Sequence, residues 1–335
     1  MTDHTAEVSP GGNETPKVRP RIAVVIPCYK VGDMALGVIE RIGPEVNSIY
    51  VVDDACPEKI GQRVQEKCRD PRVRVLFHDI NQGVGGAVMT GYAKALEEGA
   101  DIIVKLDGDG QMDPAMIPRL VKPLIDEEAD YSKGNRFFSL EAARSMPAVR
   151  WFGNIGLSFL AKLSTGYWDI FDPANGFTAI NATVLRLLPM EKISRRYFFE
   201  TDMLFRLNTI QAVVADMPMN AKYGDEKSGL SVTSSFFEFS ARHIANLFKR
   251  IIYNYYLRDF NIASLELAAG LAMGSFGTVF GLYHWITSVA RGEAATAGTV
   301  MLAALPVILG AQLILAFLSF DVSARPAWPI SKKLK

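Results

Sequence analysis

The chain contains 335 residues, of which 49% are hydrophobic and 21% charged, and its 36 lysines and arginines balance 36 acidic residues. Because a nucleic-acid-binding protein presents a basic surface, this balance excludes nucleic acid as a partner. The hydrophobic residues gather after residue 262, so the composition predicts a soluble part followed by a membrane part.

Residues 1–20 are rich in Thr, Glu, Gly and Pro and contain no apolar stretch. This composition predicts a disordered tail and not a signal peptide, so the N-terminal half is expected to stay in the cytosol.

The three cysteines, Cys28, Cys56 and Cys68, have no metal-ligand spacing and cannot all pair, which favours a reducing compartment.

From residue 21 to residue 127, β-branched runs alternate with stretches of helical length. We expect strands at 21–29, 48–54, 73–78 and 101–106, and helices at about 33–42, 58–69, 84–98 and 114–127. This alternation is typical of parallel βαβ units, so the sequence predicts an α/β fold with a mainly parallel, doubly wound sheet. In such a sheet the ligand lies beyond the carboxyl ends of the strands.

The carboxyl ends of three expected strands carry residues that suit a phosphorylated ligand. They are Pro27, Asp53, Asp54, Asp107 and Asp109. The last two stand one residue apart on a glycine-rich turn, and such carboxylates suit Mg²⁺ or Mn²⁺, which keep positions open for phosphates. An Asp-x-Asp pair alone also occurs in solvated loops, but the convergence of five residues at one edge favours a site.

The run Asn81-Gln-Gly83-Val-Gly85-Gly86 follows the third expected strand and opens a helix. Its backbone N–H groups could receive an anion at the helix N-terminus. The same glycines also allow tight packing of a helix on a strand, so both interpretations stay open. The run is not a dinucleotide-binding fingerprint, because the third glycine and the acidic residue after the next strand are missing.

The next part of the chain is less regular, with polar groups interleaved with aromatic residues. Arg136 and Arg150 are either surface charges or phosphate ligands, because the guanidinium fork matches phosphate oxygens. A helical pattern starts at Glu200 and a strand is expected at 212–218. The polar loop around Lys227 is of the kind that closes over a ligand.

Two long apolar windows, 267–290 and 294–320, contain no Asp, Glu, Lys or Arg. Each exceeds the roughly 20 residues that span a bilayer, so they predict a transmembrane hairpin. Residues 236–258 form a basic, aromatic-rich amphipathic pattern that suits a membrane surface, although a plain packed helix has the same period. Lysines and arginines flank both outer ends of the hairpin, which predicts cytoplasmic termini and a cytosolic soluble part.

These patterns predict five segments. They are a disordered tail at 1–20, an α/β domain at 21–230, amphipathic membrane-surface helices at 231–261, two transmembrane helices within 262–321, and a basic cytoplasmic tail at 322–335. The chain is therefore expected to be an integral membrane protein with two spans.

Six short motifs resemble those of one family. They are Val-Ile-Pro27-Cys-Tyr, Val-Val-Asp53-Asp54, Asn81-x-Gly83-x-Gly-Gly-Ala-x-x-x-Gly91, Leu-Asp107-Gly-Asp109-Gly-Gln111-x-Asp-Pro, Gly134-Asn-Arg136 and Asp172-x-x-x-Gly176-Phe177. In combination they resemble the family-2 glycosyltransferases of GT-A fold. The likeness is closest to the polyprenyl-phosphate branch, which includes dolichol-phosphate mannose synthases and bacterial enzymes that make undecaprenyl-phosphate glucose. It covers about residues 21–230, and a C-terminal pair of spans also occurs in that branch.

The resemblance implies roles for the matching residues. Nucleotide-sugar binding is implied for Pro27, Tyr29, Asp53, Asp54, Gly83, Gly86, Asp107 and Gly108. A Mg²⁺ or Mn²⁺ ion with the donor diphosphate is implied at Asp107, Asp109 and Gln111, and the lipid phosphate at Arg136, Arg150, Asn154, Lys222 and Lys227. Asp109 would act in catalysis through the metal, and Asp172 and Asp202 are the candidates for a base or a sugar-orienting carboxylate. Thr178 stands where the family often has Arg, so one expected phosphate contact is missing.

The resemblance implies inverting transfer of one sugar from a nucleotide sugar, UDP-glucose or GDP-mannose first, to undecaprenyl or dolichyl phosphate. A phosphate monoester is largely dianionic at neutral pH, so it can attack the sugar without a protein base. The metal would stabilise the departing nucleoside diphosphate while arginines hold the acceptor. The expected location is the cytosolic face of a bacterial-type plasma membrane, and homo-oligomers are left open.

Two alternatives remain. A processive polysaccharide synthase also joins such a domain to membrane spans, but those enzymes resemble one another in a Gln-x-x-Arg-Trp motif. Here Pro147 stands in the glutamine position before Arg150-Trp151. The second alternative is a non-enzymatic membrane protein that senses a nucleotide, and the acid pair at the end of a strand favours chemistry over it.

Overall fold

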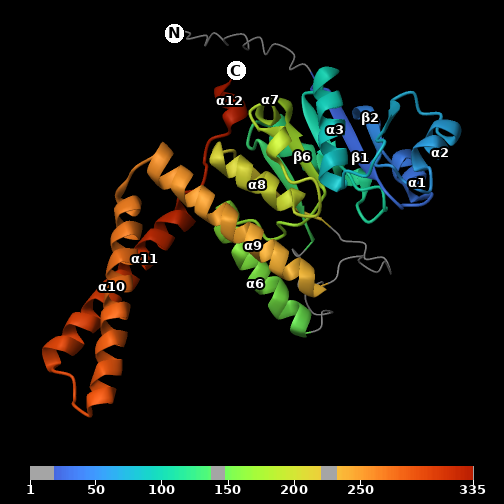
Figure 1. Cartoon of the computed structure of the whole chain (residues 1–335). Coiled ribbons are helices and arrows are strands. Elements are labelled where there is room, and N and C mark those ends of the chain that lie inside the picture. The colour runs from blue at the N-terminus through green and yellow to red at the C-terminus, as the bar shows by residue number, and fades with distance from the viewer. Residues whose placement is uncertain (1–18, 137–147, 220–231, 335) are drawn as a thin grey trace, which may run out of the picture.

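A computed structural model describes residues 19–136, 148–219 and 232–334, with the backbone alone at 148–155 and 232–236. An α/β domain holds the first part of the chain (Figure 1). Two long helices, α10 (Ile262–Arg291) and α11 (Ala297–Ser323), extend away from it as a hairpin (Figure 1). The predicted fold class, a mainly parallel α/β domain followed by two long apolar helices, is confirmed.

One sheet of seven strands forms the centre of the domain. Its strands are β1 (Ile22–Cys28), β2 (Val46–Asp53), β3 (Val73–Phe77), β4 (Ile102–Lys105), β5 (Tyr131–Asn135), β6 (Thr178–Asn181) and β7 (Val214–Pro218). Their order is β3-β2-β1-β4-β6-β5-β7, and only β6 runs antiparallel to its neighbours. The connections reverse direction between β1 and β4, which is where open α/β sheets bind ligands.

Helices cover both faces of this sheet and continue beyond it. They are α1 (Met34–Glu40), α2 (Ile60–Lys67), α3 (Val84–Glu97), η1 (Pro114–Met116), α4 (Ile117–Ile125), α6 (Ala148–Thr165), α7 (Ala182–Leu185), η3 (Met190–Lys192), α8 (Phe199–Thr209), α9 (Val232–Ile251), η4 (Ile252–Arg258) and α12 (Ile330–Lys333). The first four expected strands and helices lie where the alternating pattern predicts them, within a few residues.

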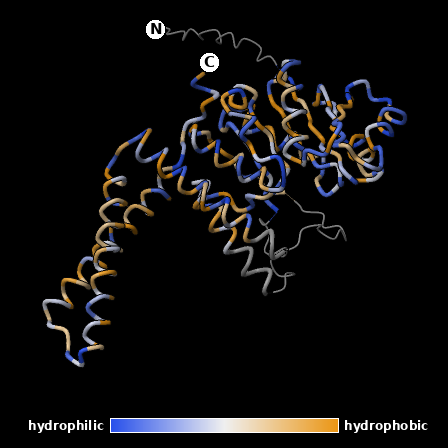
Figure 2. Tube along the Cα trace, in the orientation of Figure 1, coloured by the Kyte–Doolittle hydropathy of each residue, from blue (hydrophilic) through white to orange (hydrophobic). Residues whose placement is uncertain are grey.

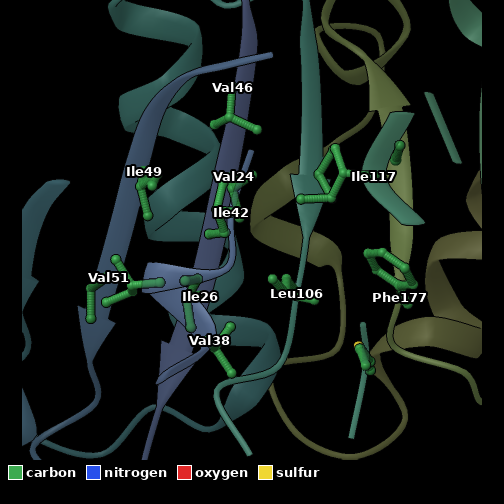
Figure 3. Close-up of a cluster of buried hydrophobic side chains, with 14 of the residues drawn as sticks. Val24, Ile26, Val38, Ile42, Val46, Ile49, Val51, Leu106, Ile117 and Phe177 are labelled. Atoms are coloured by element: carbon green, nitrogen blue, oxygen red, sulfur yellow. The ribbon is translucent and has the colours of Figure 1, made fainter. Parts of the chain in front are cut away.

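Two hydrophobic cores form because successive strand residues point to opposite faces of the sheet. Val24 and Ile26 of β1 belong to the core under α1, α2 and α4, which Figure 3 shows. Ala23 and Val25 of the same strand belong to the core under α3 and α8. All seven residues of β1 are buried, as expected for a central strand covered on both sides.

The sequence pattern did not predict β5, β6 or α6. All five residues of β5 are buried although Ser132, Lys133 and Asn135 are polar, because each finds a partner inside the domain. Ser132, for example, donates to the Leu120 carbonyl of α4 at 2.5 Å. A strand whose polar side chains are satisfied by tertiary contacts shows no apolar alternation, so its period is invisible in the sequence.

The long helix α9 lies alongside α6 below the domain (Figure 1) and widens into the π-helical turn η4. His243 of α9 is buried against α6, where its Nδ1 lies 2.7 Å from Ser164 Oγ. Arg250, near the end of α9, donates through Nε and Nη2 to the Leu163 carbonyl at 3.1 and 2.8 Å. These contacts fix α9 to the α/β domain through α6 and orient the hairpin that follows.

Helices α10 and α11 pack closely through small residues. A Cβ added at Gly277 would lie 2.7 Å from the Ala303 carbonyl, and one at Gly310 would lie 2.6 Å from Gly274 N. Most residues along the two helices are hydrophobic (Figure 2), and only 17% and 11% of their most apolar windows are buried. Helices of 30 and 27 residues exceed the roughly 20 that cross a bilayer, so the pair fits a membrane hairpin.

The chain returns to the domain after α11 and ends beside α7 (Figure 1). The Asp130 carboxylate accepts the N–H groups of Ile330 and Ser331 at 2.9 and 2.8 Å, and that of Val213 at 2.9 Å. The Asp321 carboxylate, at the end of α11, accepts two bonds from Arg250 at 2.6 and 3.0 Å. The end of α11 is therefore tied to α9, and the segment that follows it is tied to the domain.

Candidate active site

The turn after β4 brings Asp107 and Asp109 to the carboxyl edge of the sheet. Gly108 is buried and Gly110 has a φ of 77°, a left-handed conformation that glycine adopts without strain. Asp109 Oδ1 accepts the N–H of Gln111 at 3.0 Å, which closes the turn. The Asp107 side chain keeps 27% of its surface exposed, so its carboxylate is accessible from the edge.

Lys105, the last residue of β4, is buried under this turn with 1% of its side chain exposed. Its Nζ lies 2.8 Å from Asp107 Oδ1 and 3.1 Å from Glu200 Oε1 of α8. Burial acts to lower the pKa of Lys105, but the two carboxylates outweigh it and raise the pKa above its ordinary value. Neither Lys105 nor Glu200 was among the predicted site residues.

Gly176, in the loop before β6, lies against Lys105 and Asp107. A Cβ at this position would lie 2.3 Å from Lys105 Nζ and 2.5 Å from Asp107 Oδ2. Only glycine lets the loop pass this close, which explains the glycine of the Asp172-x-x-x-Gly176 motif in physical terms.

Arg136 and Asp172 form a bidentate ion pair next to that loop. Arg136 Nε donates to Asp172 Oδ2 at 2.7 Å and Nη2 to Oδ1 at 3.0 Å. Asp172 is buried with 2% of its side chain exposed, whereas Arg136 keeps 32%. Both carboxylate oxygens of Asp172 are engaged, which argues against its predicted role as a base and makes it the residue that orients Arg136.

Lys133 of β5 is the second buried lysine under the loop. Its Nζ donates to the Asn175 carbonyl, and Asn175 in turn donates to Asp172 Oδ2 at 3.3 Å. Burial lowers the pKa of Lys133 to about 8, although Glu200 and Asp172 oppose the shift. In the sheet, Thr178 of β6 lies opposite Lys105 of β4 on one side and Lys133 of β5 on the other. The three residues therefore form one row across three strands.

Asp53 and Asp54 shape the neighbouring loops. Asp53 accepts the N–H groups of Cys56 and Gly61, both at 2.7 Å, and so fixes the turn that leads into α2. Asp54 contacts His78 Nδ1 at 2.7 Å and accepts the N–H groups of Gln82 and Gly83, both at 2.8 Å. These carboxylates hold the predicted border of the nucleotide site in place.

The glycines that open α3 serve close packing. Gly86 N donates to the Arg195 carbonyl at 3.1 Å, and a Cβ added at Gly83 would lie 2.5 Å from that same oxygen. A Cβ added at Gly91 would lie 2.3 Å from Val25 of β1. Of the two interpretations left open by the sequence, the packing one fits, because Asp54 and a carbonyl already take the N–H groups that an anion would need.

Asp202 is buried among partners of its own on α8, and its role as a base or a sugar-orienting carboxylate stays a prediction. It accepts Ser194 N at 2.9 Å, Arg206 Nε at 3.2 Å and Asn246 Nδ2 at 3.2 Å, and so ties α8 to α9. Residues two apart on a helix point to nearly opposite sides. Glu200, two positions earlier, therefore points to the other side and reaches Lys105.

The remaining predicted residues are placed as follows. Pro27 is part of β1 and pairs with Val52, and Tyr29, 44% exposed, follows that strand. Arg150 and Asn154 lie on α6, where the structure describes the backbone alone. Lys222 and Lys227 lie outside the described residues.

Asp107 and Asp109 fit a divalent metal ion that completes its shell with phosphate oxygens and water. In the part of the chain that the structure describes, no group of three or more His, Cys, Asp or Glu side chains could hold a metal. Two carboxylates, with Gln111 beside them, suit Mg²⁺ or Mn²⁺ bound together with a diphosphate, because Mg²⁺ sites commonly use one or two carboxylates plus substrate oxygens.

The described geometry has counterparts in known proteins. The family model named glycosyl transferase family 2 matches residues 23–188, which run from β1 to the loop after α7. Residues 23–188 are a glycosyl transferase family 2 domain. The protein is accordingly a glycosyltransferase, as the motifs predict, and its sheet is that of the GT-A fold.

Among curated proteins, three relatives of this glycosyltransferase are informative. A UDP-N-acetylglucosamine–dolichyl-phosphate N-acetylglucosaminyltransferase of Methanococcus voltae is 29% identical, over 60% of this chain and 86% of the relative. An undecaprenyl-phosphate mannosyltransferase of Micrococcus luteus is 29% identical over 59% and 82%. A polyprenol monophosphomannose synthase of Mycolicibacterium smegmatis is 28% identical over 67% and 85%.

Solved structures are similar in fold. Glucosyl-3-phosphoglycerate synthase from Mycobacterium tuberculosis, in complex with Mn²⁺, UDP and glucosyl-3-phosphoglycerate, aligns with a TM-score of 0.52. The sequence identity is 20%, and the alignment covers 69% of this chain and 80% of that one. At this identity the likeness shows the fold of the domain.

Proposed function

We propose that this glycosyltransferase moves one sugar from a nucleotide sugar to a polyprenyl phosphate, with inversion, at the cytosolic face of a membrane. The observation that carries the proposal is the attachment of an apolar hairpin to the domain that presents the Asp107–Asp109 turn. The names of the three relatives include dolichyl phosphate, undecaprenyl phosphate and polyprenol, which supports a polyprenyl phosphate acceptor.

The donor would lie at the carboxyl ends of β1, β2 and β4. Asp107 and Asp109, with Gln111, would hold Mg²⁺ or Mn²⁺, whose positive charge stabilises a departing nucleoside diphosphate. Base and ribose would lie along Pro27, Tyr29 and the loops that Asp53 and Asp54 hold. Buried hydrogen bonds of this kind keep the border of the site rigid, which favours transfer because little reorganisation is needed.

The acceptor phosphate would bind next to Arg136. Asp172 fixes the guanidinium at two points, so its positive charge is presented in one orientation at the site edge. Further contacts are proposed from two residues of α6, Arg150 and Asn154, and from Lys222 and Lys227, which precede α9 in the sequence. An oxygen of the phosphate dianion forms the bond to the anomeric carbon as the bond to the diphosphate breaks, and no protein base is required.

Helix α9 would lie on the membrane surface. Phe237, Ile244 and Phe248 recur at helical spacing, and 75%, 47% and 61% of their surfaces are exposed. An exposed apolar stripe next to a membrane hairpin suits the boundary between lipid headgroups and acyl chains. This placement would hold the active site at the height where a polyprenyl phosphate presents its headgroup.

A donor panel tests the proposal. Purified protein in membranes is given labelled UDP-glucose, UDP-N-acetylglucosamine or GDP-mannose, with undecaprenyl or dolichyl phosphate and Mn²⁺. We expect label from one donor to enter the chloroform layer. Asp109→Ala should abolish this transfer, whereas the matched control Asp126→Asn, an exposed carboxylate on the far end of α4, should preserve it.

Two outcomes would overturn parts of the proposal. Release of free nucleotide without labelled lipid would show that the acceptor is another molecule. Transfer that continues in Asp109→Ala, or without any divalent ion, would show that the β4 turn does not hold a catalytic metal.

A further inference from the structure

Lys105 is one of two buried lysines near the candidate active site. It stands on β4 opposite Thr178 of β6, with Glu200 of α8 above it and Gly176 against its Nζ. Its side chain is 1% exposed, and its ammonium contacts Asp107 Oδ1 at 2.8 Å and Glu200 Oε1 at 3.1 Å. A charge buried this deeply is tolerated only when it is paired, and here both partners are carboxylates.

The ammonium occupies the position that a metal ion would take between two carboxylates. Without it, the carboxylates of Asp107 and Glu200, which lie 2.8 and 3.1 Å from its Nζ, would have no cation between them, and like charges so close attract a cation. With it, the negative charge of Asp107 is partly neutralised on the Oδ1 side. Asp107 therefore offers a divalent ion less attraction than an unpaired carboxylate would.

We propose that Lys105 is a positioning residue that acts as a built-in cation and makes divalent metal binding depend on the donor diphosphate. It excludes a metal from the space between Asp107 and Glu200 and steers Asp107 toward the Asp109 side of the turn. The metal then gains enough oxygen ligands only when diphosphate oxygens join Asp107 and Asp109. Glu200 balances Lys105, so the lysine does not pair with Asp107 alone. The inference rests on the donor half of the proposed function and does not depend on the acceptor.

Titration calorimetry of Mn²⁺ into the full-length protein in detergent, with and without UDP or GDP, tests this role. We expect the wild type to bind Mn²⁺ at least about tenfold more tightly with a nucleotide than without one, since outer contacts change metal affinity by about 10–100-fold. Lys105→Met should raise the nucleotide-free Mn²⁺ affinity by about tenfold or more, because Asp107 and Glu200 lose their cation. Lys105→Arg keeps the charge and should retain the weak nucleotide-free binding.

Glu200→Gln should weaken Mn²⁺ binding, whereas Lys105→Met should strengthen it. Lys105 would then pair with Asp107 alone, so Mn²⁺ affinity in the presence of UDP or GDP should fall by about tenfold. A merely structural role of the cluster would weaken Mn²⁺ binding in both variants, whereas the built-in cation predicts changes of opposite sign. Thermal unfolding shows whether each variant folds, and if Lys105→Met does not, Lys105→Gln takes its place with the same expectation, because it also removes the cation.

The inference is overturned if Lys105→Met binds nucleotide-free Mn²⁺ no more tightly than the wild type, or if Glu200→Gln keeps wild-type affinity with nucleotide. It is also overturned if the wild type binds Mn²⁺ equally well without nucleotide. These titrations contain no lipid and so do not depend on the acceptor. If Mn²⁺ binding behaves as expected but the donor panel forms no labelled lipid, the proposed acceptor is wrong and the proposed metal site is not.

Discussion

The acidic pair at the end of β2 and the one at the end of β4 look alike in sequence but have different partners. Asp53 and Asp54 are 3% and 2% exposed, and their oxygens accept backbone N–H groups from the loops around them. The Asp107 side chain keeps 27% of its surface exposed, and it forms an ion pair with the buried Lys105.

The difference shows what decides the role of a carboxylate at the edge of a sheet. Where nearby loops supply N–H donors, the carboxylate accepts their hydrogen bonds and holds the loops at the border of the site in place. Where the turn is closed by glycines and a lysine lies beneath, a carboxylate remains accessible and its charge can serve a metal and a diphosphate. The two pairs should therefore fail in different ways when they are changed.

The largest effect is expected from Asp109→Asn. Loss of one metal-holding charge should lower the rate of transfer by about a hundredfold or more, because electrostatic stabilisation of the leaving group is lost. The unfolding temperature should change little, since the residue closes a surface turn. Initial rates at saturating Mn²⁺ measure the loss of transfer, and a thermal unfolding curve measures the change in stability. A large loss of stability with only a modest loss of rate would show that Asp109 acts like the structural carboxylates Asp53 and Asp54.

Gly176→Ala should have the next largest effect. The added Cβ would come within 2.5 Å of Asp107 Oδ2, so the carboxylate or the loop must shift. A displacement near 1 Å at a reacting centre costs up to about a hundredfold in rate. Gly156→Ala on α6 is the matched control, because the new Cβ would meet no described atom within 4 Å apart from its chain neighbours and the backbone of its own helix. Equal rates for the two variants would contradict the close approach.

Asp54→Asn should act on stability more than on chemistry. The new amide nitrogen cannot accept the N–H of Gln82 or Gly83, and a buried donor left without an acceptor costs about 1–3 kcal/mol. Chemical unfolding should show this loss, while kcat of the folded enzyme changes less than in Asp109→Asn. Asp79→Asn, which changes an exposed carboxylate nearby, serves as the control. A rate loss as large as that of Asp109→Asn at unchanged stability would place Asp54 in direct contact with substrate.

Lys133→Met should change how stability depends on pH. Burial lowers the pKa of Lys133 to about 8, against 10.5 for an unperturbed lysine, so between these values the unfolded chain holds more protons. The wild type therefore gains stability as pH rises through this window, and its full burial cost is present below pH 8. Relative to Lys133→Met, the wild type should gain about 2 kcal/mol between pH 7 and pH 10. Unfolding at both pH values measures this gain, and Lys67→Met, at an exposed position, should show none.

Much of the fold could be predicted from the sequence because its local patterns agree with its tertiary contacts. The β-branched run of β1 becomes a strand buried along its whole length, and the uncharged windows become α10 and α11. The prediction missed β5, where Lys133 and Asn135 are satisfied by Asn175 and Asp216 from distant parts of the chain. Such partners cannot be read from local periodicity.

The site could be predicted where a short motif contains the functional residues. It could not be predicted where the rotation of a helix determines which of its residues faces the site. The spacing of Asp107 and Asp109 indicates the turn. The sequence Glu200-Thr-Asp202 names two acids but not which one faces the sheet, and the prediction chose Asp202 although Glu200 reaches Lys105. A lysine within the apolar strand β4 was the available signal, because a buried charge requires a partner of opposite sign.

The mass of the lipid product tests the central claim most directly. Mass spectrometry of the chloroform extract, after incubation with the active donor and undecaprenyl phosphate, should show a single new species heavier by one sugar residue. Asp109→Asn should form about a hundredfold less of that species in the same time, or even less. A ladder of species with increasing numbers of sugars would contradict single transfer, and unchanged lipid alongside released nucleotide would contradict the polyprenyl phosphate acceptor.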